Sequence, residues 1–491
     1  MMHPLTSRLR VTVVCVAAVV SCRAGLAAPA ATGMRYDLVI HGGRVIDPES
    51  GLDAIRDVAV ENGTIALVAE GRLEGGEENI DATGLVVAPG FIDLHQHAWD
   101  RQSLDLKVCD GVTTALELEI GTADVAGWYR DRAGASRLHH GVAAGHPPAR
   151  MAELGDPPAF LPAADSRAGT VASTPEVIAA VARRIDRGLA EGAVAVGFGL
   201  AYTPTATDDE IREMFRVAAR HGASCHVHLR GRGPAATLSA AETAKLAEQA
   251  GASLHIVHAQ ASASGPAVHD MLRLLERFQA AGQDVTAEVY PWTAGMTEIS
   301  SAIFADGWQE RLGVDYGDLQ WGGTNERLTP ETFARYRKRG GLVLVHRDTA
   351  PSVAAALAHP LTMVASDGLV GHPRNAGTSA RVLGHYVRET RTISLATALA
   401  KLSLQPARRL EGRLPTLRRK GRIRAGADAD LVLFDPAKVA AGATYEMPQQ
   451  PSSGIAWVVV AGTPVVRRGQ LVPDAFPGTP IRATAGPRPR Q

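Results

Sequence analysis

Cysteine is scarce in this sequence, and neither sign of charge prevails. The chain has 491 residues but only 4 cysteines, and two of these, Cys15 and Cys22, lie within the first 30 positions. Cys109 and Cys225 cannot supply a disulfide framework, so stability must come from a hydrophobic core. The 51 basic and 51 acidic side chains give a formal net charge of +0. This balance argues against a nucleic-acid partner, because such proteins usually carry a clustered basic excess.

The start of the chain lacks an apolar run long enough to remain as a membrane span. Two arginines precede the apolar segment Val11 to Val20, and small residues follow it, so residues 1–30 are expected to be an export signal. Val19 to Cys22 resembles a bacterial lipobox, in which Cys22 would be lipidated and tether the chain to a membrane. The alternative is ordinary cleavage within Ala27 to Ala31. Either route predicts an exported protein, which is periplasmic, secreted or held as a membrane-anchored lipoprotein.

Short β-like runs separated by Gly, Asn and Asp turns occur near both ends of the chain. They predict a small β-sandwich domain built from residues 34–88 and 415–475. Residues 476–491 are rich in proline and glycine and are expected to be a disordered tail.

The middle of the chain, residues 89–414, alternates short apolar strands with helical stretches, which is typical of an α/β protein. Eight strands are expected, and eight is the number that a closed (β/α)8 TIM-like barrel requires. They are Val86 to His95, Thr113 to Ile120, Gly141 to His146, Ala193 to Leu200, Ser224 to Arg230, Ser253 to Gln260, Val285 to Pro291 and Thr362 to Gly368. An irregular segment at about 293–360 is expected to be an insertion or lid after the seventh strand.

Histidines stand at the carboxyl ends of several of these strands. His95 and His97, two residues apart on a strand, point to the same face and can offer two imidazoles to one metal ion. His228 ends the fifth strand, His258 the sixth, and Asp367 the eighth. Because barrel active sites lie at this end, the set predicts a site for one or two Zn²⁺ ions with an open position for water.

Two further histidines and the aspartate have other interpretations. His255 is three residues from His258, so it is expected on the opposite face of the strand, packed against the outer helices. His226 shares the face of His228 but lies deeper in the barrel. Asp367, which precedes a glycine, could instead cap a helix. The metal hypothesis therefore depends on the conjunction of residues on four strands rather than on any one of them.

These residues resemble the amidohydrolase superfamily, in which such a barrel joins two halves of a β-sandwich. The segment Gly421 to Pro436 is similar to the closing sandwich strand of that superfamily. Within it, the chain is most similar to the N-acyl-D-amino-acid deacylases. The stretches that carry this resemblance are Pro89 to Asp93, Gly111 to Thr114, Glu288 to Gly295, Ser366 to Leu369, His372 to Arg374 and Gly377 to Gly384.

The resemblance implies a role for each matching residue. His95, His97, His228 and His258 would be metal ligands, Asp367 would be both a ligand and the catalytic general base, and Tyr290 would contact the substrate. The implied reaction is hydrolysis of an amide C–N bond of a small molecule by a zinc-activated water. Arg230 and Arg374 are candidates for gripping a substrate carboxylate through a bidentate fork, with a surface salt bridge as the alternative for either.

The sequence departs from the family pattern at the ligand that would bridge two metals. The deacylases carry a cysteine near the end of the second strand, whereas here Ala115 to Gly121 has no thiol. Other members of the superfamily bridge the metals with a carbamylated lysine on the fourth strand, but no lysine lies between Lys107 and Lys245. Glu119, or less readily Glu117, could bridge with a carboxylate. The alternative is that both form a salt bridge inside the barrel and that only one metal binds.

Two other departures affect the substrate. Gln260 stands where the family has a lysine, and Met296 stands where it has a serine.

The leading hypothesis is an exported zinc-dependent deacylase of N-acyl-D-amino acids. A cyclic amide or dipeptide hydrolase and a non-catalytic exported binding protein are the alternatives. The natural substrate and its stereochemistry, the metal count and the oligomeric state remain open at this point.

Overall fold

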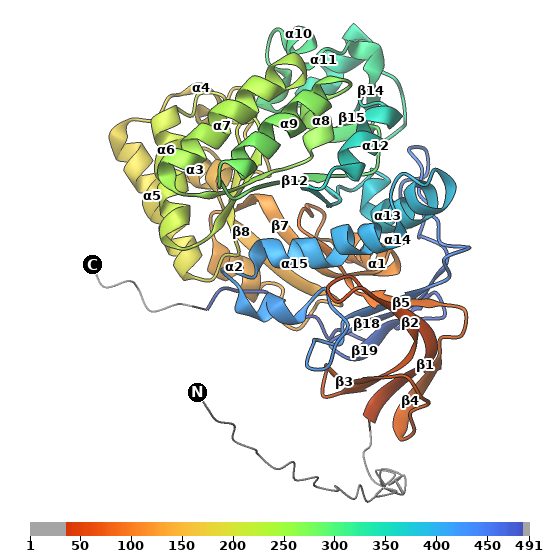
Figure 1. Cartoon of the computed structure of the whole chain (residues 1–491). Coiled ribbons are helices and arrows are strands. Elements are labelled where there is room, and N and C mark those ends of the chain that lie inside the picture. Colours follow the sequence, from red (N-terminus) through yellow and green to blue (C-terminus); the bar gives the residue numbers. More distant parts are fainter. Residues whose placement is uncertain (1–35, 485–491) are drawn as a thin grey trace, which may run out of the picture. The chain divides into compact units, whose positions relative to one another are not determined.

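The computed structural model describes residues 36–484 (Figure 1). The expected export signal and the lipobox cysteine Cys22 lie outside the described residues. Within residues 36–484, no helix combines the length and the apolar character needed to cross a bilayer.

Eight parallel strands form a barrel, and the order of the strands in the sheet follows the sequence. The strands are β6 (Phe91–Asp93), β7 (Val112–Thr122), β8 (His139–Gly145), β9 (Val196–Gly199), β10 (Ser224–His228), β11 (Ser253–Ile256), β12 (Val285–Val289) and β16 (Thr362–Val364). Most of their residues are buried on both faces, as expected of parallel strands covered by helices. The predicted α/β class with a TIM-like barrel is confirmed.

Helices cover the outside of the barrel (Figure 1). They include α1 (Arg101–Cys109), α2 (Val125–Arg130), α3 (His146–Leu154), α5 (Pro175–Ala190), α6 (Asp208–Arg220), α7 (Ala236–Ala250), α9 (Ala267–Ala280), α12 (Ala350–Ala358), α13 (Arg374–Arg381), α14 (Leu395–Leu399) and α15 (Gln405–Leu410). In α6, Thr207 caps the first turn through the backbone N–H of Glu210. One face of α6 buries Ile211 and Phe215 against the barrel, so its amphipathic pattern fixes its orientation.

The barrel closes at a seam where β6 and β16 face each other without a regular ladder. One side-chain oxygen of Asp93, Oδ1, accepts the backbone N–H of His95 at 3.2 Å and that of Ser366 at 2.9 Å. Beyond Asp93, the backbone N–H of Gly368 donates to the carbonyl of His95 at 3.2 Å. Side chain and backbone together therefore hold the first and last strands in register.

The first predicted strand, Val86 to His95, is in fact two strands. Residues Val86–Pro89 form β5, which belongs to the small domain's sheet, and β6 begins at Phe91. The break falls at Gly90, where a Cβ would collide with the side chain of Thr113. Because the apolar run continues through both strands, the sequence pattern does not reveal this change of sheet.

Both ends of the described chain contribute to a single nine-stranded sheet. Its strands are β1 (Tyr36–Asp47), β2 (Leu52–Glu61), β3 (Thr64–Ala69), β4 (Gly76–Asp81), β5, β17 (Leu431–Phe434), β18 (Ile455–Val460), β19 (Thr463–Arg467) and β20 (Gln470–Leu471). β5 pairs with β1 on one side and with β17 on the other, which joins the two ends (Figure 1). Ile40 and Val58 share a buried core with Leu431 and Leu433.

The segment between β12 and β16, expected to be an insertion or lid, is an ordered subdomain. It has a three-stranded sheet of β13 (Ala294–Glu298), β14 (Leu319–Trp321) and β15 (Leu342–His346), with α10 (Trp308–Leu312) and α11 (Pro330–Arg339). Its aromatic core includes Trp308 stacked on Phe333 at 5.1 Å and Trp321 stacked on Tyr336 at 4.0 Å.

The predicted disorder of residues 476–491 is wrong for the described part of that tail. Ile481 is buried, its backbone N–H donates to the carbonyl of His140 at 2.7 Å, and its own carbonyl accepts from the Tyr129 hydroxyl at 2.7 Å. Ile481 shares a hydrophobic cluster with Leu116 and Val194 of the barrel. The burial of Ile481 and Ala483, together with backbone hydrogen bonds along the segment, holds in place a stretch whose composition alone is typical of disorder.

Candidate metal centre

Six side chains proposed as ligands from the sequence lie at the carboxyl end of the barrel, where they form two groups. One group contains His95, His97, Glu119 and Asp367, the other contains Glu119, His228 and His258, and within each group the possible ligand atoms lie within 4.8 Å of one another. These six side chains are between 1% and 11% exposed. The barrel therefore brings together residues that are up to 272 positions apart, from His95 to Asp367.

In the first group, two imidazole nitrogens face two carboxylate oxygens. Nε2 of His95 lies 2.9 Å from Nε2 of His97. Oε2 of Glu119 is 3.1 Å from the first nitrogen and 3.0 Å from the second. Oδ1 of Asp367 is 3.5 Å and 3.4 Å from the same two atoms.

The remaining ring nitrogens of the two histidines show which atoms carry protons. Nδ1 of His95 lies 2.5 Å from Oε1 of Glu288, and Nδ1 of His97 lies 2.6 Å from Oε2 of Glu117. A neutral imidazole that donates from Nδ1 to a carboxylate keeps its lone pair on Nε2. Only electron-pair donors then converge at the centre of the group, so the residues present fit a metal cation.

The electrostatics of His95 agree with this conclusion. Burial alone would lower its pKa, but the negative charges of Asp367, Glu288 and Glu119 outweigh burial and raise the pKa of His95 well above its ordinary value. The site thus has an excess of negative charge that a bound cation would neutralise.

The second group shares Glu119 with the first. Oε1 of Glu119 is 2.7 Å from Nδ1 of His228 and 3.1 Å from Nε2 of His258, and these two nitrogens are 3.1 Å apart. Each oxygen of Glu119 therefore belongs to a different group, which is the position of a ligand that bridges two metal ions. Glu117, the less favoured candidate, instead bonds to the outer nitrogen of His97.

Two of these residues have an uncommon backbone conformation. His258 has φ of 35° and Asp367 has φ of 51°, both in the left-handed region that side chains other than glycine rarely adopt. The strand has ended two residues before His258 and three residues before Asp367, and the turn redirects each side chain into the mouth of the barrel. Such strain is commonly found at functional sites.

This turn also corrects the interpretation of His255. Regular alternation would put His255 and His258 on opposite faces, but alternation stops where β11 ends at Ile256. His255 lies inside the barrel, with Nε2 3.0 Å from Oε2 of Glu288 and its ring 4.6 Å from that of His226. It therefore supports Glu288 and does not pack against the outer helices.

A cavity lies over the two groups. Its floor contains five of the six proposed ligands, all except His95, and its walls carry Tyr202 and Tyr290. The inserted subdomain supplies much of the rest of the lining, which includes Met296, Ile303, Leu312, Val345 and Arg347. Apolar walls above convergent polar groups are typical of a small-molecule site.

The three residues predicted to contact substrate have different positions. Tyr290 is 1% exposed and lines the cavity. Arg374 lies behind it, with Nη2 2.9 Å from Oδ1 of Asp367, while its Nε and Nη1 have no partner among the described residues. Arg374 thus orients Asp367, and its role towards a substrate carboxylate stays a prediction.

Arg230 is directed away from this cavity, and its predicted carboxylate grip is corrected. It donates to the backbone carbonyls of Pro204 at 2.9 Å and Ala206 at 2.7 Å. The strand ends at His228, so alternation no longer sets the direction of the following side chains. Arg232 lines the cavity in its place.

Sequence reasoning missed four residues that contribute to the site. Glu288 holds His95, and its place two residues before Tyr290 on one strand face could have revealed it. Glu117 was considered as a ligand that bridges two metals or as part of a salt bridge inside the barrel, and not as the partner of His97. Arg232 and Arg347 come from a loop and from the insertion, where no periodicity indicates direction.

Comparison of the sequence with known proteins identifies a family and several similar proteins. The sequence matches the amidohydrolase family over residues 78–466. It is 29% identical to the D-aminoacylase of Alcaligenes xylosoxydans xylosoxydans, across 88% of this chain and 94% of that protein. It is 30% identical to the N-acyl-D-glutamate deacylase of the same organism, across 92% of this chain and 97% of that protein.

The fold is similar to solved structures of the same kind. The N-acyl-D-glutamate deacylase from Bordetella bronchiseptica, in complex with zinc and a phosphonate inhibitor that mimics the tetrahedral intermediate, superposes with a TM-score of 0.80. The two chains are 26% identical, and the match covers 92% of this chain and 100% of the other.

Proposed function

The chain belongs to the amidohydrolase family, and on that premise we propose that it removes the acyl group from N-acyl-D-amino acids by zinc-dependent hydrolysis. The observation that carries the proposal is the Glu119 carboxylate, which places one oxygen in each of two ligand groups on the floor of the pocket. Relatives that are 29% and 30% identical over nearly their whole length are deacylases of such substrates. The cyclic-amide, dipeptide and binding-protein alternatives are not favoured.

The residues that would hold zinc are His95, His97, Asp367 and Glu119 on one side, and Glu119, His228 and His258 on the other. Bound zinc supplies a Lewis acid that polarises the scissile carbonyl and lowers the pKa of a coordinated water. Nitrogen and oxygen donors of this kind suit that ion. Glu288 and Glu117 fix the tautomers of His95 and His97, so that both rings present lone pairs to the centre.

Asp367 is positioned to act as the general base. It lines the cavity, and Arg374 and the histidines lower its pKa despite burial, so the carboxylate is ionised at neutral pH. It can accept a proton from the attacking water and return it to the nitrogen of the leaving amine. The ion pair between Nη2 of Arg374 and Oδ1 keeps the carboxylate on the floor of the pocket during this transfer.

The proposal is tested with zinc-loaded protein and a panel of N-acyl-D-amino acids, N-acyl-L-amino acids, dipeptides and cyclic imides. Release of the free D-amino acid is expected, and Asp367→Asn should abolish it. Hydrolysis confined to dipeptides or cyclic imides would contradict the proposal. Unchanged hydrolysis by Asp367→Asn, with its metal content preserved, would contradict the role of Asp367 as base.

Export is a separate part of the proposal, supported by the signal-like residues 1–30. Mass spectrometry of the mature amino terminus separates the two routes. A lipidated Cys22 would establish a membrane tether, and a free terminus within Ala27 to Ala31 would establish ordinary cleavage. Full-length protein in the cytoplasm would contradict export.

A further inference from the structure

Arginines gather around the substrate cavity on the side of the inserted subdomain. Arg232 and Arg347 line the main cavity. A second cavity lies next to it, since Arg232, Ile303 and Leu312 line both. Arg230 and Arg311 also line this second cavity, and no acidic residue does.

None of these four arginines forms an ion pair with a carboxylate of the described residues, by a 4.0 Å limit. Arg230 and Arg311 donate only to backbone carbonyls, and Nη1 of Arg347 donates to the carbonyl of Leu312 at 3.3 Å. Asp348 also lines the main cavity, where the charges of Arg347 and Arg232 act on it, but it forms no ion pair with either and accepts from the hydroxyl of Ser264 at 3.1 Å. Two guanidinium groups at this wall of the pocket therefore face a single carboxylate, which leaves an excess of positive charge there.

Arg232 has one donor that no residue between 36 and 484 uses. Its Nε is buried without a partner among them, Nη2 donates to the carbonyl of Ala261 at 3.0 Å, and Nη1 lies 2.7 Å from Nε2 of His228. If His228 gives its Nδ1 lone pair to a metal ion, its Nε2 carries the ring proton and can no longer accept from Arg232. In the zinc-loaded protein, Nε and Nη1 of Arg232 are then both available to another acceptor.

We propose that Arg232 and Arg347 form a second anion subsite, which holds a carboxylate of the substrate in addition to its α-carboxylate. The preferred substrates are then N-acyl-D-amino acids with an acidic side chain. This inference rests on the proposed deacylase function and specifies its substrate class. Guanidinium groups that line a pocket are suited to carboxylates because they offer paired, fixed donors. Ile303 and Leu312, between the two cavities, provide apolar contacts for the methylene groups of such a side chain.

The test compares N-acetyl-D-glutamate with N-acetyl-D-glutamine, which have almost the same shape and differ by one charge. For the zinc-loaded protein, kcat/KM should be higher for the glutamate derivative by at least about 30-fold, as expected for a hydrogen-bonded charge. Arg347→Met and Arg232→Met should each lower this ratio by about tenfold, mainly through KM for the glutamate derivative. Arg273→Met, an exposed arginine of α9, is the control and should leave the ratio unchanged.

The ratio also serves as its own control for folding, because both substrates are measured on the same preparation. Calorimetry with the products adds a readout that needs no turnover: D-glutamate should bind the zinc-loaded protein at least about tenfold more tightly than D-glutamine. Equal kcat/KM values for the two derivatives, or ratios unchanged in both variants, would overturn the subsite while leaving the deacylase function intact. Absence of hydrolysis of every N-acyl-D-amino acid would instead overturn the proposed function.

Discussion

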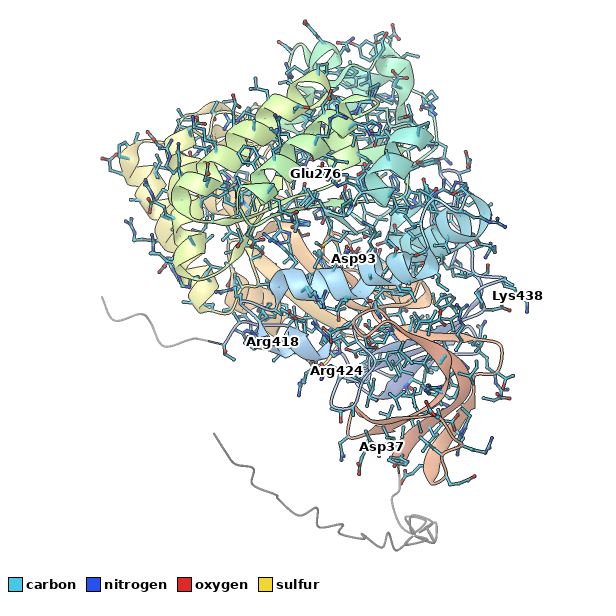
Figure 2. All side chains as sticks on the ribbon, viewed as in Figure 1. Asp37, Asp93, Glu276, Arg418, Arg424 and Lys438 are labelled. Atoms are coloured by element: carbon cyan, nitrogen blue, oxygen red, sulfur yellow. The ribbon has the colours of Figure 1, made fainter. Side chains whose placement is uncertain are left out.

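Nζ of Lys107 lies 2.7 Å from Oδ2 of Asp93 at the seam of the barrel. Both side chains are buried, with 1% and 5% exposure, and Asp93 is labelled in Figure 2. The other oxygen of Asp93 accepts the backbone N–H groups of His95 and Ser366. His95 is a proposed ligand, and Ser366 directly precedes Asp367. The ion pair between Lys107 and Asp93 therefore holds two of the strand ends that carry the metal centre.

Lys107→Met should therefore weaken both the fold and the metal site. Removing the lysine leaves the Asp93 carboxylate buried without its charge partner, which typically costs about 3–5 kcal/mol. Chemical denaturation should show this loss in the free energy of unfolding, and zinc content after dialysis should also fall. Lys438→Met, an exposed lysine labelled in Figure 2, is the control and should change neither. Wild-type stability in Lys107→Met would show that the seam does not depend on this pair.

Glu119 and Glu117 allow a second comparison, because they lie two residues apart on β7 and meet different nitrogens. Glu119→Gln removes a negative charge that both ligand groups share. If the wild-type protein binds two zinc ions per chain, elemental analysis of the variant should find at least one fewer. Glu117→Gln changes only the partner of the outer nitrogen of His97, and zinc affinity should weaken by about 10–100-fold. Equal effects of the two substitutions would contradict the bridging position of Glu119.

Gly197 tests how the barrel makes room for Glu119. A Cβ at Gly197, on β9, would collide with the backbone carbonyl of Glu119, although β8 separates β9 from β7 in the sheet. Gly197→Ala should displace β7, lower the melting temperature and reduce zinc content, although Gly197 is not one of the proposed metal ligands. Gly412→Ala is the matched control, because a Cβ there meets no atom within 4 Å. Zinc content unchanged from wild type in Gly197→Ala would show that β7 can shift without disturbing the ligands.

The sequence predicted those features that depend on regular repetition. Eight strands follow from the alternation of short apolar runs with helical stretches, and His95, His97 and His228 were found because they stand at predicted strand ends. Glu119 was found through the resemblance to the deacylases, as the replacement for their cysteine. The failures occur where alternation stops. His255 was misplaced because His258 lies in a left-handed turn, and Arg232 was overlooked in favour of Arg230 because the chain leaves the strand at His228.

Packing explains the remaining differences. No local pattern shows that Gly90 must be small to pass Thr113, and this contact divides the first predicted strand between two sheets. Ile481 stands in a tail of disordered composition, yet the barrel buries it. Both outcomes depend on residues that are far away in sequence, so they cannot be read from the neighbouring residues.

The last prediction concerns Glu210, which lies in a buried network away from the metal ligands. Its Oε1 is 2.9 Å from Nε2 of His146, and its Oε2 accepts from Nη1 of Arg150. Burial alone would raise its pKa, but the hydrogen bonds and charges of His146 and Arg150 outweigh burial and lower the pKa of Glu210 to about 2.

The sign of the pH dependence follows from linkage. A carboxyl group whose pKa is lower in the folded state stabilises the fold above its unfolded pKa of 4.5, and this contribution disappears as the pH falls towards about 2. At pH 7, Glu210→Gln should therefore lower the free energy of unfolding by about 3 kcal/mol. The difference from wild type, measured by urea denaturation, should shrink steadily between pH 4.5 and the lowest pH at which the protein remains folded. Glu248→Gln, an exposed position on α7, should match wild type at every pH. A Glu210→Gln difference that stays constant over this range would show that the charge of Glu210 does not stabilise the fold.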